Sequence, residues 1–182
     1  MSQLVQHDPG GKTRLKLPDD VTGTAEISPC QRYRPALSRD WTEPGAQTRA
    51  ILFVGLNPSV AAADVSDPTC HRELTFARDW GFTRYLKGNL LDWRATSPRD
   101  IPHDPELARS PRNMEVLAEM ARDAEVIVMA SGNVHARFAE IAEETEALLR
   151  AEGKPLMCLG KNQSGAGKHP LYIRRDAPLI PY

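Results

Sequence analysis

Four short apolar runs, separated by segments with helical periodicity, constrain the fold of this chain more than any other feature of its sequence. The runs are AILFVGL (50–56), YLKGNLL (85–91), VIVMA (126–130) and PLMCLG (155–160), each bounded by turn-forming residues. Such runs are typical of buried strands. Strands that alternate with helices favour a parallel sheet with helices on both faces. The pattern therefore predicts an α/β protein, a three-layer sandwich around a central, mostly parallel four-stranded sheet.

Three of the intervening segments carry helical signals. Asp67 and Pro68 are typical of a helix start, and Gly81 is typical of a helix end. Ser110 and Pro111 repeat the start signal before a second amphipathic segment. Apolar residues at helical spacing mark a third helix at Phe138, Ile141, Ala142, Leu148 and Leu149.

The length and composition fit one globular domain. Of 182 residues, 41% are hydrophobic and 26% are charged, which lies inside the range of globular proteins and argues against long disorder. Residues 1–23 are polar and rich in Gly, Pro and Asp, so we expect a flexible N-terminal segment there. We expect residues 24–182 to form a single α/β domain, with residues 24–28 as an edge strand.

Charge, cysteine spacing and hydropathy limit the partners and cofactors. A formal net charge of -1 gives no global basic signature, so contact with nucleic acid would need a local patch. Cys30, Cys70 and Cys158 stand far apart and form no CxxC pair, so we expect reduced thiols and no metal or other cofactor. The apolar runs are too short to span a bilayer. We therefore expect a cytoplasmic monomer without membrane contact.

The candidate site lies where the apolar runs end, because ligands of α/β sheets bind beyond the carboxyl ends of the strands. The first run leads into Gly55, Leu56, Asn57, Pro58 and Ser59. Glycine lets a backbone approach a ligand, proline stiffens the turn, and the asparagine amide can contact a water or a base edge. The same residues also fit an ordinary turn, since Asn-Pro commonly opens one.

Polar residues also follow the other runs. Asn89 lies inside an apolar run, so its amide either ties down a neighbouring loop or faces a ligand. Trp93 and Arg94 can stack on a base and hold a phosphate, or form an ordinary surface pair. The third run leads to the polar turn SGN (131–133), and the fourth is followed by a Gly-rich segment that ends in Lys168 and His169. This histidine can face an anion or simply be exposed.

Together these pieces resemble a bacterial and phage protein family known as DUF1643, over about residues 30 to 175. The motifs that carry the resemblance are RYR (32–34), FVGLNPS (53–59), DVSDPT (64–69) with Arg72 following, FARDWGF (76–82), NLLDWRATSPRDI (89–101), Asn113, SGN (131–133) and GKHPLYI (167–173).

The pattern of that family is in turn similar to the uracil-DNA glycosylase superfamily. Residues 55–59 resemble the GxNPG motif of its mismatch-specific branch, residues 89–101 look like a segment of its thermophilic branch, and Asn89 resembles its base-reading asparagine. His169-Pro170 resembles its closing His-Pro motif. Two features differ. Leu171 stands where serine usually follows, and three scattered cysteines cannot supply the four that bind an iron–sulfur cluster in the thermophilic branch.

The resemblance implies a uracil-DNA-glycosylase-like fold and a DNA glycosylase that hydrolyses the N-glycosidic bond of an unusual or modified base, flipped out of DNA. It implies that Asn57 orients the water and His169 stabilises the departing base. Asp67 either caps a helix or faces the sugar. The implied substrate-binding residues are Gly55, Leu56, Pro58, Ser59, Asp67, Asn89, Trp93, Arg94, Gly132, Asn133, Lys168 and Arg174.

Two other functions fit the same residues. The first is a non-hydrolytic module that binds a nucleotide or nucleic acid and keeps the pocket of the fold. The second is a structural or partner-binding protein in which Asn57 and His169 are buried tie residues.

Overall fold

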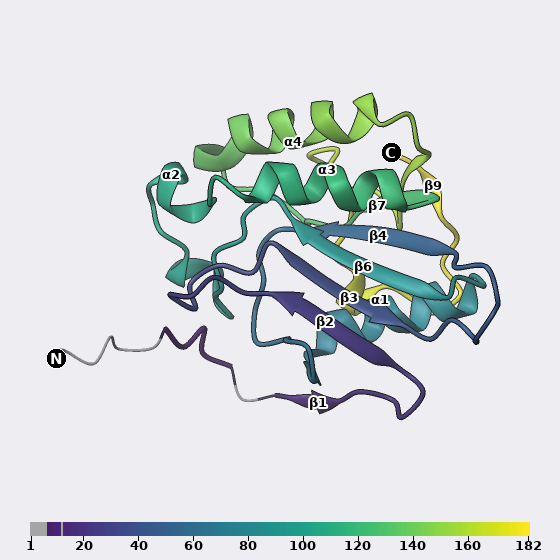
Figure 1. The fold of residues 1–182 in the computed structure, drawn as a ribbon. Helices are drawn as coiled ribbons and strands as arrows, with labels where there is room; N and C mark the ends of the chain where they lie inside the picture. Colours follow the sequence, from purple (N-terminus) through teal and green to yellow (C-terminus); the bar gives the residue numbers. More distant parts are fainter. Residues whose placement is uncertain (1–6, 12) are drawn as a thin grey trace, which may run out of the picture.

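The main sheet of the computed structural model has seven strands, in the spatial order β2-β3-β6-β4-β7-β8-β9 (Figure 1). The structure describes residues 7–11 and 13–182. The strands are β2 (Thr22–Glu26), β3 (Ala36–Asp40), β4 (Ala50–Gly55), β6 (Arg84–Asn89), β7 (Val126–Met129), β8 (Leu156–Cys158) and β9 (Ile180–Pro181). The four predicted runs form the parallel centre β6-β4-β7-β8.

The prediction of a mostly parallel four-stranded sheet is wrong in strand number and in strand direction at the edges. β2 pairs antiparallel with β3, β3 with β6, and β9 with β8, so antiparallel pairs flank the parallel centre on both sides. These strands lack apolar runs. β2 alternates exposed with half-buried positions, and β3 carries the buried Arg39, whose guanidinium donates to the carbonyl groups of Ala62 and Val65 at 2.6 and 2.9 Å. A search for apolar runs therefore misses them.

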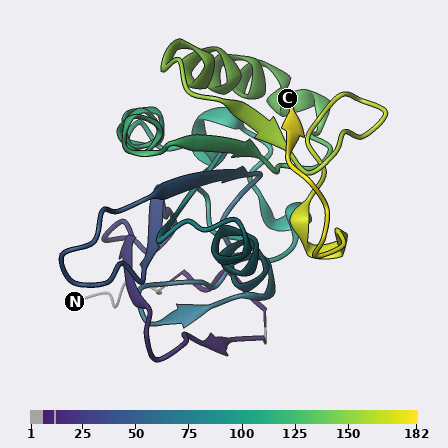
Figure 2. The same ribbon diagram turned by 90° about the vertical axis from the view of Figure 1, so that its right-hand side faces the viewer.

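Helices cover both faces of the sheet, which gives the three layers that the sequence predicts (Figures 1 and 2). α1 (Pro68–Asp79) lies on one face, and α3 (Asn113–Asp123) and α4 (Ala139–Ala151) lie on the other. A hydrophobic core lies on each face of the sheet, and alternate residues of β4 belong to each. Phe53 packs with α1, and Leu52 packs with α3 and α4. The shorter helical segments are η1 (Pro98–Asp100), α2 (Pro105–Ala108), η2 (Ala136–Phe138) and η3 (Pro170–Tyr172).

The start and end of α1 confirm their sequence signals. The carboxylate of Asp67 accepts a hydrogen bond from the Cys70 N–H at 2.8 Å, and Pro68 is the first helical residue. Gly81, just beyond the helix, has a φ of 78°, a conformation that favours glycine. The Asp67 cap fixes the first turn of α1, which lies near the carboxyl end of β6.

The start of α3 differs from its prediction. Ser110 does not cap this helix, which begins at Asn113. Instead, the hydroxyl and the N–H of Ser110 both donate to the buried carboxylate of Asp92. Ser110 therefore resembles a helix cap in sequence, but both of its donors bond to the carboxylate of Asp92 instead of to the helix.

Part of the segment predicted to be flexible is paired in the structure. β1 (Leu15–Lys16) pairs antiparallel with β5 (Val65–Ser66), and the edge strand β2 begins two residues before the predicted residue 24. Residues 1–6 and 12 of that segment lie outside the described residues, and its flexibility remains a prediction. Within the described chain, no helix combines the length and the apolar character that a membrane span requires.

Candidate functional site

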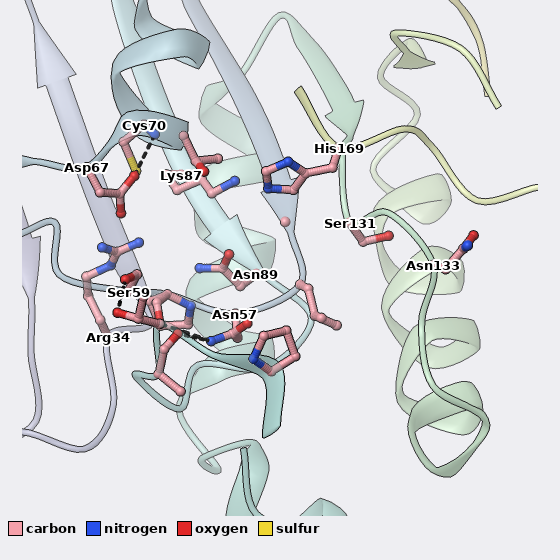
Figure 3. Close-up of a pocket in the computed structure, with 17 residues that line it drawn as sticks. Arg34, Asn57, Ser59, Asp67, Cys70, Lys87, Asn89, Ser131, Asn133 and His169 are labelled. Carbon is pink, nitrogen blue, oxygen red and sulfur yellow. Dashed lines mark hydrogen bonds between the residues drawn. The ribbon is translucent and has the colours of Figure 1, made fainter. Parts of the chain in front are cut away.

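A pocket of about 310 Å³ lies at the carboxyl ends of β4 and β6 (Figure 3). Its walls come from the loop after β4, the end of β6, the first turn of α1, the turn after β7 and the segment before η3. The lining residues that the sequence predicts are Gly55, Leu56, Asn57, Pro58, Ser59, Asp67, Asn89, Asn133 and His169. The others are Arg34, Thr69, Cys70, Lys87, Ala95, Thr96, Pro98 and Ser131.

Asn89 is the most unusual polar group of the pocket. It is the last residue of β6, it is 1% exposed, and neither atom of its amide has a hydrogen-bond partner among the described residues. A buried polar group without a partner destabilises a fold by about 1–3 kcal/mol. Because buried amides are almost always paired, an unpaired one in a pocket wall is a candidate for contact with a ligand or an ordered water.

A different asparagine performs the structural tie at this place. The Nδ2 of Asn113 donates to the carbonyl oxygens of Asn89 and Leu90, at 3.2 and 3.1 Å. Asn113 therefore holds the end of β6 from the α3 side, while the side chain of Asn89 projects to the α1 side. The hydrogen-bonded tie at this place is thus made by Asn113, and the structure shows no such tie by the side chain of Asn89.

Lys87 is a pocket residue that the sequence reasoning missed. Its side chain projects from the same face of β6 as that of Asn89, two residues later. The Nζ of Lys87 lies 2.8 Å from Glu73 Oε1, and the two side chains are 5% and 0% exposed. The hydroxyl of Tyr85 donates to the other carboxylate oxygen. Burial raises the pKa of Tyr85 well above its ordinary value, so this phenol remains a donor.

Gly55 makes room for these two polar groups. A Cβ atom there would lie 2.6 Å from Lys87 Nζ and 2.8 Å from Asn89 Oδ1. Both distances are shorter than a normal contact, so a side chain would displace the ammonium or the amide. The predicted close approach at this glycine is thus an approach of pocket side chains to the backbone.

Asn57 has the structural role of a turn residue, and it also lines the pocket. Its Nδ2 donates to the carbonyl oxygens of Ala95 and Pro58, at 2.7 and 3.1 Å, which ties the loop after β4 to the segment after β6. The donor end of the amide is therefore occupied by the main chain. The oxygen Oδ1 is the atom left to accept a hydrogen bond at the pocket.

His169 lies across the pocket from Asn57, with its ring directed inward on the side of Lys87 (Figure 3). Its Nδ1 accepts a hydrogen bond of 3.4 Å from the Leu171 N–H. In the neutral ring, the proton is therefore on Nε2. Burial lowers the pKa of His169 below its ordinary value, so the neutral ring dominates at neutral pH. This residue is a hydrogen-bond donor that carries no charge.

Arg34 and Asp67 are two charged residues that also line the pocket. Arg34 is 1% exposed, and its Nη1 donates to the Ala61 carbonyl at 2.6 Å, while its Nε has no partner among the described residues. Asp67 caps α1 and also lines the pocket, so its two readings are compatible. Burial raises the pKa of the adjacent Cys70 thiol to about 12, which keeps it neutral. The RYR motif was the only sequence signal for Arg34.

Several predicted residues lie outside the pocket. Trp93 packs edge-on against Tyr33, with ring centroids 5.5 Å apart, and Arg94 donates to the Gln31 carbonyl at 2.9 Å. Arg174 forms an exposed ion pair with Asp176. Their local packing turns these side chains away from the pocket. The predicted residues placed elsewhere are Trp93, Arg94, Gly132, Lys168 and Arg174.

The described side chains include no group of three or more His, Cys, Asp or Glu residues arranged to hold a metal ion. The polar groups that face the pocket are instead amides, one imidazole, one ammonium and one guanidinium, together with the Asp67 carboxylate. Such a set binds a ligand through hydrogen bonds and charge.

Fold and site together define an α/β protein with a polar ligand pocket at the carboxyl ends of its parallel strands. A family model matches residues 32–171, and its description reads "Protein of unknown function (DUF1643)". The chain belongs to this family, as its motifs predict. No curated protein and no solved structure shows significant similarity to it.

Proposed function

We propose that the pocket binds a nucleobase and that the protein is a DNA glycosylase for an unusual or modified base. The observation that carries this proposal is the unpaired, buried amide of Asn89. An amide offers a donor and an acceptor side by side, and the hydrogen-bonding edge of a base offers the complement. The resemblance of residues 55–59, Asn89 and His169-Pro170 to the uracil-DNA glycosylase superfamily supports the same function.

The size of the pocket supports a single base as the ligand. Its volume of about 310 Å³ lies at the lower end of the range of about 300 to 1,000 Å³ for small-molecule sites. A base that is paired and stacked inside a duplex is enclosed by its neighbours and cannot enter such a pocket. A base from duplex DNA would therefore have to leave the stack first, at a cost of about a few kcal/mol.

The proposed reaction breaks the bond between the sugar C1′ and the base nitrogen. The electron pair of that bond goes to the base, water adds to C1′, and the proton that the water loses ends on the departing base. The sugar becomes positive and the base negative on the way, so the site must stabilise an anion. The Nε2–H of His169 donates to that anion, and the ammonium of Lys87 adds positive charge beside it.

Asn57 would serve the water side of the reaction. Its donor end is fixed by main-chain carbonyls, so Oδ1 accepts a hydrogen bond from the water and orients it. A neutral amide is too weak a base to remove the proton. The rate would therefore depend mainly on how well His169 and Lys87 stabilise the departing base.

A second candidate function is a non-hydrolytic module that binds a nucleotide or nucleic acid. It is favoured by the hydrogen bonds that make Asn57 a structural tie, and by Leu171 at the place where serine usually contacts the DNA backbone in glycosylases. This candidate keeps the base-reading role of Asn89 and removes the water-orienting role of Asn57.

The test is a search for base release. Purified protein is incubated with single- and double-stranded DNA that contains uracil, thymine mismatches or bulky modified bases, and abasic sites are scored. We expect release of one base, lost in Asn57→Ala and His169→Ala and kept in Arg174→Ala, a surface control. A folded wild-type protein that releases no base but binds a nucleoside through Asn89 would favour the second candidate. If the folded protein neither releases a base nor binds a nucleoside, both candidate functions are refuted.

A further inference from the structure

A second hollow adjoins the pocket at its mouth. The two share the lining residues Leu56, Pro98 and Asn133, so a molecule can extend from one into the other. The second hollow, which we call the basic groove, has a volume of about 360 Å³. Its other lining residues are Arg99, Ile101, His103, His135, Arg137 and Phe138.

The ionisable side chains of the basic groove are all basic. Two arginines and two histidines line it, and none of its described lining residues is acidic. The Nη1 of Arg137 lies 3.5 Å from His103 Nδ1, so two of these basic side chains meet directly. An arginine side chain can only donate, so Nδ1 of His103 accepts this hydrogen bond, and the contact holds the Arg137 guanidinium in the groove.

The arginines of the groove also lack the carboxylate partners that several other surface arginines have. Arg112 pairs with Glu26, and Arg175 pairs with Asp79. By contrast, the described residues place no carboxylate within ion-pair distance of Arg99 or Arg137. Both positive charges are therefore available to a ligand.

Local structure fixes one of these charges in place. The guanidinium of Arg137 lies over the ring of the buried Phe138, 4.6 Å from its centroid, and its Nε is buried without a partner among the described residues. The nearby Asp104 is occupied as the cap of α2, where its carboxylate accepts the Glu106 N–H at 3.0 Å. A guanidinium held over a ring has less conformational freedom to lose when it makes a bidentate contact.

We propose that the basic groove binds the sugar–phosphate backbone of a nucleic-acid strand while one base of that strand occupies the pocket. This inference rests on the proposed function, because it takes the pocket as the base site. Only a sugar separates a base from its phosphates, so phosphates lie just outside a pocket that encloses the base. The guanidinium groups of Arg99 and Arg137 match phosphate oxygens in geometry and charge. Such contacts position a strand without reading its sequence.

The groove also explains how a chain with a net charge of -1 can hold a polyanion. Attraction to phosphates depends on the local field, which falls off within about 10 Å at ordinary salt. A local patch without acidic side chains can therefore attract a polyanion although the net charge of the chain is slightly negative. It takes the place of the phosphate contact predicted at Arg94, which lies outside the pocket.

The test measures the binding of single-stranded oligonucleotides of about 12 nucleotides, a typical length for single-strand sites, by fluorescence anisotropy. The variant is Arg99→Ala/Arg137→Ala. The matched control is Arg122→Ala/Arg174→Ala, which removes the same charge from arginines paired with Glu152 and Asp176. We expect the groove variant to weaken binding about tenfold, and to reduce the slope of log Kd against log salt by about 1.4, which is about 0.7 for each lost phosphate contact. The control is expected to resemble the wild type.

Nucleoside binding, measured by calorimetry, separates this inference from the proposed function. The groove variant should keep nucleoside binding, which also shows that it is folded, and Asn89→Ala should lose it. If the groove variant and its control bind the oligonucleotide equally, the basic groove does not bind the backbone, and the proposed base site is unaffected. Competition by polyglutamate as strong as that by the oligonucleotide would also overturn the proposed role of the groove, because any polyanion would then suffice. DNA and RNA strands of one sequence show which sugar the groove accepts.

Discussion

The ammonium of Lys87 lies 2.8 Å from the carboxylate of Glu73, and both side chains are buried where β6 faces α1. This ion pair joins a strand to a helix and also places a positive charge on the pocket wall. It therefore makes separate predictions for stability and for binding.

Removing one partner of this pair should be strongly destabilising. Glu73→Gln leaves the Lys87 charge buried and uncompensated, which reduces the free energy of unfolding by about 3–5 kcal/mol. The double variant Lys87→Met/Glu73→Leu should recover part of that loss, because apolar side chains replace both charges while the buried Tyr85 hydroxyl loses its acceptor. Urea unfolding measures both changes. The double variant should still bind nucleosides poorly, and wild-type binding by it would remove Lys87 from the site.

Two buried asparagines should respond in opposite ways. Asn113→Ala removes the hydrogen bonds to the Asn89 and Leu90 carbonyls and should reduce the free energy of unfolding by about 1–3 kcal/mol. Asn89→Ala removes a buried amide that has no partner among the described residues, which relieves a cost of about 1–3 kcal/mol and leaves a small cavity, so the free energy of unfolding should stay the same or rise. Nucleoside binding should nevertheless disappear. A large loss of stability in Asn89→Ala would show that this residue is a tie after all.

His169 should make the folded protein less stable in weak acid. Burial lowers its pKa in the folded state, so below its ordinary pKa of about 6.5 the unfolded chain binds the proton more readily. Above about pH 6.5 the lowered pKa does not change the free energy of unfolding. As the pH falls through about 6.5 the free energy of unfolding decreases, and the decrease becomes constant below the folded pKa of His169. Urea unfolding of wild type and His169→Gln across this range measures it. Identical pH profiles of the two proteins would contradict the lowered pKa.

The three cysteines should differ in reactivity toward a disulfide reagent. Cys30 is exposed, and its hydrogen bond with Ser28 lowers the pKa of its thiol. Cys70 and Cys158 are buried, and burial raises the pKa of Cys70 to about 12. Thiolates are the reactive form, so we expect one fast thiol in the native protein and all three after unfolding. A Cys30→Ser variant should have no fast thiol, and rapid labelling of that variant would show that the pocket opens.

The central fold follows from local sequence signals. The four apolar runs became the four parallel strands, and the Asp67-Pro68 pair capped α1 where expected. These signals are local because a buried strand needs continuous apolar residues and a helix needs a cap beside its first turn. The edge strands β2, β3 and β9 are stabilised by partners far away in the chain, which a local pattern does not show.

Some residues of the candidate site could likewise be predicted from the local sequence, and others could not. Asn57, Asn89 and His169 could be found from the sequence because each directly follows or ends an apolar run or lies in a recognisable motif. Lys87 could not, because inside a strand a lysine usually points to solvent. Only the buried carboxylate of Glu73 keeps it inside. Trp93 and Arg94 were predicted to line the pocket and do not, because Trp93 packs against Tyr33 and Arg94 donates to Gln31.

The sequence by itself determined the α/β class, the four central strands, the family and the segments that meet at the carboxyl ends of those strands. The tertiary structure alone decided which side chains of those segments share a pocket, that Asn89 is unpaired and Asn113 is its tie, and that four basic residues form a groove beside it. Strand and helix formation depend on neighbours in the chain. Burial, hydrogen-bond partners and electrostatic fields depend on neighbours in space.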